Sequence, residues 1–107
     1  MLDCVARLEL NPTFASLLLQ QAVDRLKGIP MWVFHCADDA IFPVACSDKL
    51  VRTLNAANSA SSSLVRYSRF ERDQEGFTGS VRGHSTGITA SRTPAVFEWL
   101  LELPALN

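Results

Sequence analysis

The sequence predicts an α/β fold in which parallel strands are connected by helices. Two short runs rich in β-branched and aromatic residues, 29–34 and 64–70, are separated by a segment with helical periodicity. Further helix-like segments precede the first run and follow the second. A strand, a helix and a second strand in this order favour a right-handed crossover between parallel neighbours.

The first half of the chain predicts a helix, a strand and a loop. Residues 13–27 carry spaced apolar side chains among good helix formers, and Gly28 is a suitable stop. The run 29–34 is nearly continuous in apolar residues, which is typical of a strand covered on both faces. Residues 35–45 are expected to form a loop.

The middle of the chain predicts a second helix and a second strand. Ser47 is a suitable cap for a helix that ends near Ala57 and carries apolar residues at helical spacing. The polar segment 58–63 is expected to connect this helix to the strand 64–70.

The last third predicts a long loop and a closing helix. Residues 71–92 contain His84 and exceed the roughly 12–15 residues above which loops in compact domains are often functional. Thr93 as cap and Pro94 as first helical residue begin a helix that is expected to end at Pro104. Two strands alone make a poor sheet, because each has an unpaired edge.

Composition and charge limit the classes to which the protein can belong. Its 107 residues are 48% hydrophobic and 20% charged, which is typical of a soluble globular chain of one domain. The formal charge of -1 arises from interspersed residues, so no nucleic acid and no membrane is expected as a partner. No apolar run reaches the roughly 20 residues of a membrane-spanning helix, and the N-terminal residues lack a signal-peptide pattern. A cytoplasmic location is therefore expected.

The cysteines are expected to be reduced thiols. Cys4, Cys36 and Cys46 are odd in number and have no CxxC spacing. A zinc site would need His35, Cys36, Cys46 and His84, but no pair among them has the spacing of a zinc finger, and neighbouring residues on a strand point to opposite faces. We therefore expect neither a metal ion nor a cofactor.

Four segments follow one another along the chain: "IPMWVFHCADDAIFPVACSDKLVRTL", "VRYSRF", "GH" and "TPAVFEWLL". In this order they resemble the C-terminal part of α/β-hydrolases of the esterase, dienelactone-hydrolase and prolyl-oligopeptidase-like kind. In that family a strand ends in H-G-x-x-D, and a proline, a helix, a strand, G-H and a final helix follow. The resemblance is strongest over residues 26–103. It implies that residues 1–107 are a partial α/β-hydrolase domain, the strand-helix-strand-helix portion of a parallel sheet without its N-terminal strands.

The resemblance assigns roles position by position. Asp39 falls on the catalytic Asp, His84 on the catalytic His and Pro43 on the motif proline. In such a pair the carboxylate accepts a hydrogen bond from Nδ1–H of the imidazole. It thereby stabilises the imidazolium that forms during catalysis. His35 falls on the motif His and is expected to be structural. Cys36 replaces the motif Gly, which costs strain if the backbone there needs a positive φ.

Without the resemblance, the same residues favour a simpler interpretation. Asp38 and Asp39 alone are typical of a turn, and a lone histidine such as His84 is typical of a surface loop. The order of all the motifs together favours catalysis, with Asp38 as a solvated or loop-capping neighbour. Trp32 and Trp99 are expected to anchor the core, because each lies in an apolar segment.

The nucleophile of such a hydrolase is not evident in the sequence. The family places Ser in a G-x-S-x-G turn that precedes the Asp and the His in the chain. Ser16 and Cys4 precede Asp39 but lack the glycines, and Ser80 and Ser85 follow it.

Three hypotheses follow. The first is the C-terminal segment of a serine hydrolase, a carboxylic ester hydrolase or peptidase, that is inactive alone and takes a small acyl or ester substrate when completed. The second is a non-catalytic remnant or interaction module of the same descent, which associates through its exposed sheet edge. The third is an unrelated small α/β domain.

Overall fold

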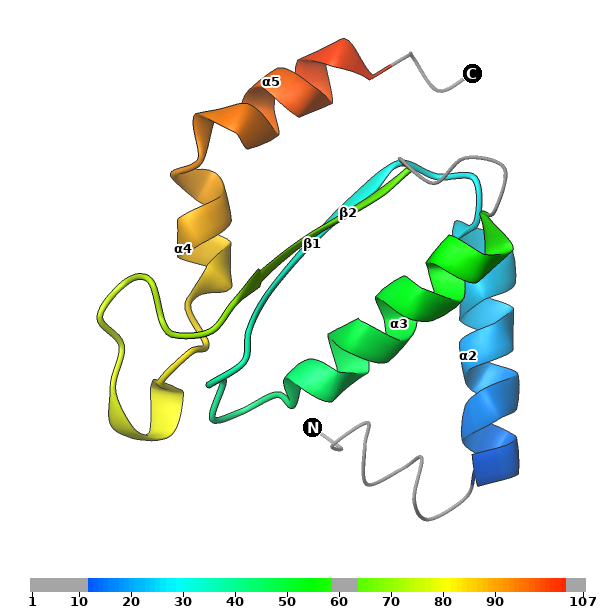
Figure 1. The fold of residues 1–107 in the computed structure, drawn as a ribbon, viewed down its shortest axis with the longest axis horizontal. Helices are drawn as coiled ribbons and strands as arrows, with labels where there is room; N and C mark the ends of the chain where they lie inside the picture. Colours follow the sequence, from blue (N-terminus) through cyan, green and yellow to red (C-terminus); the bar gives the residue numbers. More distant parts are fainter. Residues whose placement is uncertain (1–11, 59–63, 104–107) are drawn as a thin grey trace.

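The computed structural model describes residues 12–58 and 64–103, with side chains from residue 17 onward. Helices and strands alternate in the predicted order as far as the second strand, and three helical elements follow it (Figure 1). In chain order they are α2 (Pro12–Leu26), β1 (Met31–Cys36), α3 (Val44–Ala57), β2 (Val65–Phe70), the 3-10 turn η1 (Gly79–Val81), α4 (Thr86–Ser91) and α5 (Pro94–Glu102).

The two strands form a parallel sheet between two helical layers. Met31 pairs with Val65 at one end of the register, and Cys36 pairs with Phe70 at the other. Helices α2 and α3 lie on one side of the strands, and α4 and α5 lie on the other (Figure 1). The predicted α/β class and the parallel pairing are therefore confirmed. Within the described ranges, neither strand has a neighbour on its outer edge.

The apolar core is small and lies mainly under α3. Among the described residues, the buried hydrophobic side chains are Val23, Cys36, Val51 and Leu54. Leu54 and Val51 project from one face of α3, because residues three apart on a helix share a face. Only His35 and Cys36 of β1 are buried. The prediction that this strand is covered on both faces is wrong for its first four residues, because no strand or helix of the described part covers them fully.

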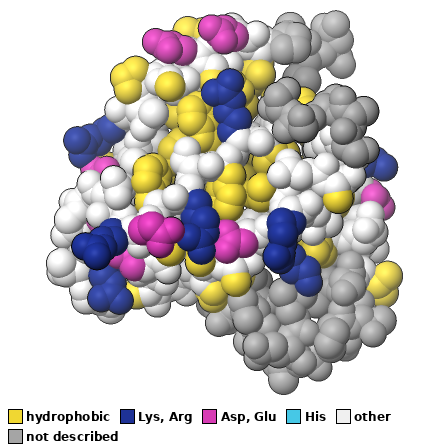
Figure 2. Space-filling view, in the orientation of Figure 1, with side chains coloured by type: hydrophobic (Ala, Val, Ile, Leu, Met, Phe, Trp, Pro, Cys, Tyr) yellow, Lys and Arg dark blue, Asp and Glu magenta, His cyan; other side chains and the backbone are white. Residues whose placement is uncertain are grey.

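Large apolar side chains are exposed on several elements. Figure 2 shows such side chains between the two helical layers, where one edge of the sheet faces the viewer. Trp32 and Trp99 meet edge to face at 5.7 Å, yet both are only half-buried, so they anchor the core less than expected. The exposed side chains are Leu17, Leu18, Ile29, Ile41, Val81, Ile88, Phe97, Leu100 and Leu101. We call Phe97, Leu100 and Leu101 the α5 apolar face.

Helix α3 begins earlier than predicted. Pro43 occupies the N-cap with φ -63° and ψ 129°, and the helix begins at Val44. A proline can stand there because the first backbone N–H groups of a helix have no partner within it. Ser47 is therefore inside the first turn and is not the cap that the sequence suggested. Its hydroxyl contacts His35 instead.

The region 71–92 contains a helix that the sequence did not predict. Helix α4 has the sequence TGITAS, in which a glycine and β-branched residues lower the helix propensity. Tertiary contacts outweigh that preference: the Thr86 hydroxyl donates to the Phe34 carbonyl at 3.4 Å, and Thr89 donates to Glu75 at 2.8 Å. At 15 residues, α2 is the longest helix in the described ranges, and none of these helices is long and apolar enough to cross a membrane.

The cysteines differ from one another. Cys36 is a free thiol with no exposed surface, and its Sγ approaches the Arg72 carbonyl at 3.7 Å. Cys46 is disulfide-bonded, so the expectation of a reduced thiol is wrong at that position. Cys4 lies outside the described residues.

Candidate active site

Two loops meet at the carboxyl ends of the strands. The loop after β1 carries Asp39, and the loop after β2 carries His84. Because the strands are parallel, both loops leave the same edge of the sheet, which is where α/β proteins place ligands. The backbone N–H of Ala40 donates to the Arg82 carbonyl at 2.8 Å, so the two loops are joined beside the histidine.

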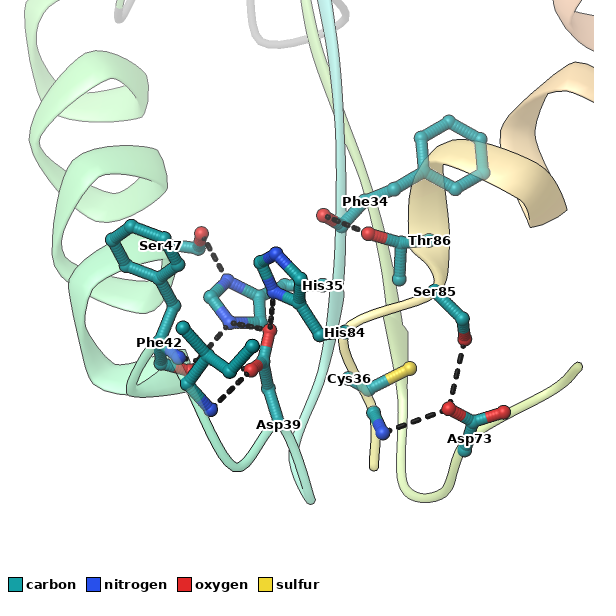
Figure 3. A network of polar contacts seen from close by, with 12 residues as sticks. Phe34, His35, Cys36, Asp39, Phe42, Ser47, Asp73, His84, Ser85 and Thr86 are labelled. Carbon is teal, nitrogen blue, oxygen red and sulfur yellow. Dashed lines mark hydrogen bonds and ion pairs between the residues drawn. The ribbon is translucent and has the colours of Figure 1, made fainter. Parts of the chain in front are cut away.

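The carboxylate of Asp39 has donors on both of its oxygens. Oδ2 lies 3.3 Å from Nδ1 of His84, and Oδ1 accepts the backbone N–H groups of Ile41 and Phe42 at 2.8 and 2.9 Å (Figure 3). Only 6% of this side chain is exposed. The two interpretations of the aspartate are therefore compatible, since one oxygen caps the turn while the other faces the histidine.

These donors keep Asp39 ionised. Burial by itself raises the pKa of the Asp39 carboxyl, but the N–H groups of Phe42 and Ile41 and the imidazole of His84 outweigh it, so that the pKa lies below its ordinary value. An ionised carboxylate can only accept hydrogen bonds. The proton between Asp39 and His84 therefore belongs to Nδ1, and Nε2 of the neutral imidazole carries the lone pair that can act as a base.

The His84 ring is positioned but accessible. It stacks on the Phe42 ring with centroids 5.8 Å apart and planes 21° apart, and 44% of its side chain is exposed. It also lines an open hollow of about 310 Å³, close to the lower limit of typical ligand pockets. The other residues around the hollow are Phe34, His35, Asp39, Phe42, Cys46, Ser47 and Thr86.

His35 contacts the loop of Asp39 through its ring. Its Nε2 lies 3.0 Å from the Phe42 carbonyl, which can only accept, so Nε2 carries the proton. In the neutral ring Nδ1 then accepts the Ser47 hydroxyl at 2.6 Å. Nε2 also lies 3.4 Å from Oδ2 of Asp39. The ring is buried and uses both nitrogens, which agrees with the expectation of a structural histidine.

Gly83 allows the histidine loop to approach the aspartate loop. Its φ is +75°, and a Cβ built there would lie 2.5 Å from both Asp38 Oδ1 and the backbone N of Asp39. A side chain at this position would therefore force the two loops apart. The glycine of the G-H pair is explained by this contact. At Cys36, by contrast, φ is not positive, so the strain considered from the sequence does not arise.

Asp73 contacts both chain neighbours of His84, and the sequence did not single it out. Its carboxylate accepts the backbone N–H of Gly83 at 2.7 Å and the Ser85 hydroxyl at 2.9 Å, one on each side of His84 (Figure 3). A signal was present in the segment "RDQEG", because Asp often caps a turn by accepting the N–H two residues later. The sequence could not indicate that the same carboxylate also reaches a residue ten positions away.

Ser80 and Ser85, the two candidate nucleophiles that the structure describes, are not placed against His84. Ser85 is 2% exposed and donates to Asp73, while Ser80 lies exposed in η1. The side chain of Ser16 and all of Cys4 lie outside the description. Within the described ranges, the recorded polar contact of the His84 ring is with Asp39 alone.

One of three comparisons with known proteins finds a similar structure. No protein-family model and no curated protein matches the chain. The chain is similar to the solved crystal structure of a thermostable esterase, with 34% sequence identity and a TM-score of 0.55. The match covers 75% of this chain but only 20% of the esterase chain. The likeness confirms the mixed α/β fold and supports descent from a hydrolase.

Proposed function

We propose that this chain is the segment of a serine hydrolase that supplies the acid and the base of a catalytic triad. Asp39 is the acid and His84 is the base. The observation that carries the proposal is the 3.3 Å contact between Asp39 Oδ2 and His84 Nδ1 at the carboxyl edge of two parallel strands. The similarity to a thermostable esterase supports the same reaction class, hydrolysis of a carboxylic ester or related acyl bond, including a peptide bond.

The chemistry assigns one step to each group. Nε2 of His84 takes the proton of the attacking hydroxyl, and it later returns that proton to the leaving alcohol or amine. The Asp39 carboxylate stabilises the imidazolium that exists between these two steps. Water then hydrolyses the acyl-enzyme with His84 again as base, which releases the carboxylic acid.

We expect the nucleophile to come from another segment, because no G-x-S-x-G turn precedes Asp39 in the sequence. Triad members act as a unit, so a histidine without its nucleophile gives little rate acceleration. We therefore expect the 107-residue chain alone to show no turnover of an activated ester above that of a His84→Ala control. Turnover must be counted after the first equivalent of product, because any exposed imidazole or thiol reacts once with such esters.

The decisive experiment adds the nucleophile. The chain is mixed or co-expressed with an esterase segment that bears a G-x-S-x-G turn, and the mixture is treated with a fluorophosphonate probe. We expect labelling of the added serine only when both segments are present, and a loss of turnover of at least about 1,000-fold in His84→Ala. Glu98→Gln, an exposed change on α5, is the matched control and leaves labelling intact. Labelling that survives His84→Ala would overturn the proposal.

A second candidate function is a non-catalytic interaction module. The exposure of the α5 apolar face favours it, and so do the strand edges that have no neighbour among residues 12–58 and 64–103, because uncovered apolar surface drives association. We expect the isolated chain to associate with itself as its concentration rises, as measured by light scattering. A monomer at high concentration would contradict this. An associated chain that never supports labelling of an added serine would favour the module over the hydrolase.

A further inference from the structure

We infer that Asp73 is a positioning residue of the candidate site: its carboxylate fixes the backbone on both sides of His84 and so holds the imidazole against Asp39. The catalytic meaning of this role rests on the proposed function. The positioning itself rests on contacts among the described residues and can be tested without any enzymatic activity.

The contacts of Asp73 enclose the histidine. Oδ2 accepts the Gly83 N–H at 2.7 Å and the Ser85 hydroxyl at 2.9 Å, and these residues are the two neighbours of His84 in the chain. Oδ1 accepts the N–H of Glu75 at 2.7 Å within its own loop. One carboxylate thus links the start of the loop to its end, and His84 has little freedom to swing away from the site.

The backbone of Asp73 is also tied to the loop that carries Asp39. The backbone N–H of Asp73 donates to Asp38 Oδ2 at 3.0 Å, and Asp38 is the chain neighbour of Asp39. Gly83 packs directly against the Asp38–Asp39 peptide. Asp73 is therefore connected to the residue before the acid and to the residues on either side of the base. Sequence reasoning left Asp38 as a solvated or capping neighbour, and this contact gives it a partner.

The donor set requires an ionised carboxylate. Burial raises the pKa of Asp73, but the Glu75 N–H, the Ser85 hydroxyl and the Gly83 N–H outweigh it and lower the pKa to about 2. All of these partners donate, so an acceptor-only group fits them. An asparagine of the same shape would turn an NH₂ group toward some of these donors and lose those hydrogen bonds.

If Asp73 only stabilised its own loop, removing another carboxylate from that loop should have the same effect. Glu75 lies in the same loop and also makes strong contacts, with the Thr89 hydroxyl at 2.8 Å and with Arg92. These contacts fasten the loop to α4 and not to the flanks of His84. Glu75→Gln is therefore the matched control, since it removes a carboxylate from the loop but leaves the enclosure of His84 intact.

The readout is the titration of Asp39, followed by NMR of ¹³C-labelled aspartate in the 107-residue chain. His35 and His84 lie 3.4 and 3.3 Å from the Asp39 carboxylate, and the buried Cys36 thiol interacts with it electrostatically. His84 contributes to lowering the pKa of Asp39, so His84→Ala should raise its midpoint. We expect Asp73→Asn to raise it in the same direction, and to add nothing further in a His84→Ala background. Glu75→Gln should leave the midpoint unchanged.

Folding is checked by circular dichroism over the same pH range. If Asp73→Asn does not fold, Ser85→Ala takes its place, because it removes one contact of Asp73 beside His84 and should raise the Asp39 midpoint by a smaller amount. An unchanged midpoint in a folded Asp73→Asn chain, or an equal rise in Glu75→Gln, would overturn the inference.

The outcomes separate this inference from the proposed function. If the titration shifts as expected but an added serine is never activated, Asp73 positions His84 and the hydrolase proposal fails. If an added serine is activated but Asp73→Asn neither lowers kcat nor raises the Asp39 midpoint, the positioning role fails while the hydrolase proposal stands. A positioning role predicts a lower kcat with KM nearly unchanged.

Discussion

The loops around Asp39 and the α5 apolar face differ in how well the described residues satisfy their side chains. In the loops, residues 37–43 and 71–85, the carboxylates of Asp39 and Asp73 are surrounded by donors at 2.7–3.3 Å. Apart from Asp38 Oδ1, no buried carboxylate oxygen in the described part of the chain lacks a partner. On α5, by contrast, Leu101 is 86% exposed and Phe97 and Leu100 are 52% exposed.

This difference indicates which interactions are local. Hydrogen bonds between two adjacent loops can form within the chain, because both loops leave one edge of one strand pair. Burial of an apolar helix face needs a second surface, and the described residues leave Phe97, Leu100 and Leu101 largely exposed. A preorganised polar site beside an uncovered apolar surface is what a segment of a larger sheet would retain.

The largest expected effect compares two leucines. Leu54→Ala on α3 removes a fully buried side chain and should lower the free energy of unfolding by about 2–4 kcal/mol. Leu101→Ala on α5 should change it by less than about 0.5 kcal/mol, because that side chain is already in solvent. Urea denaturation followed by circular dichroism measures both. A comparable loss for Leu101→Ala would show that another copy covers α5 under the conditions used.

A smaller effect tests the close approach of the two loops. Gly83→Ala must place a methyl group 2.5 Å from atoms of Asp38 and Asp39. Gly79→Ala is a matched control, because its φ is also positive, at +62°, but no atom lies within 4 Å of the added Cβ. The control should cost about 1–2 kcal/mol of stability, the penalty of a left-handed conformation, and Gly83→Ala should cost more. Equal losses in urea denaturation would contradict the tight contact.

The sequence predicted the fold where local patterns decide the structure. The periodicity of 13–27 and the apolar run 29–34 match α2 and β1 within three residues. The prediction from the sequence failed where a tertiary contact overrides helix propensity. Helix α4, which the sequence assigned to a loop, is such a case. The start of α3 was misplaced because Ser47 resembles a cap while Pro43 takes that position.

The sequence predicted that Asp39 and His84 lie together, but it did not predict the contacts of Asp73 beside them. Asp39 and His84 were singled out by a resemblance in the order of short motifs, and parallel pairing brings their loops together. Their catalytic roles stay a prediction. The role of Asp73 depends on a contact with Gly83 across ten residues, and no local pattern records such a contact. The half-burial of Trp32 and Trp99 was missed for a related reason, since an apolar pattern predicts burial without showing whether a covering surface is present.

The smallest expected effect is the acid sensitivity of the loops. Asp39 and Asp73 have pKa values below their ordinary value of 3.8, and that of Asp73 is about 2. A depressed pKa in the folded state means that the unfolded state binds protons first as the pH falls. Both groups therefore contribute stability that is fully present above about pH 4 and is lost as the pH falls toward 2. Because Leu54 and its neighbours are apolar, the core under α3 has no such dependence.

We expect the urea midpoint of the chain to fall between pH 4 and 2, and to fall less steeply in Asp73→Asn. Asp24→Asn, which removes an exposed carboxylate on α2, should keep the slope of the original chain. A slope in Asp73→Asn as steep as in the original chain would show that Asp73 is not ionised in the folded state in the way its donors require.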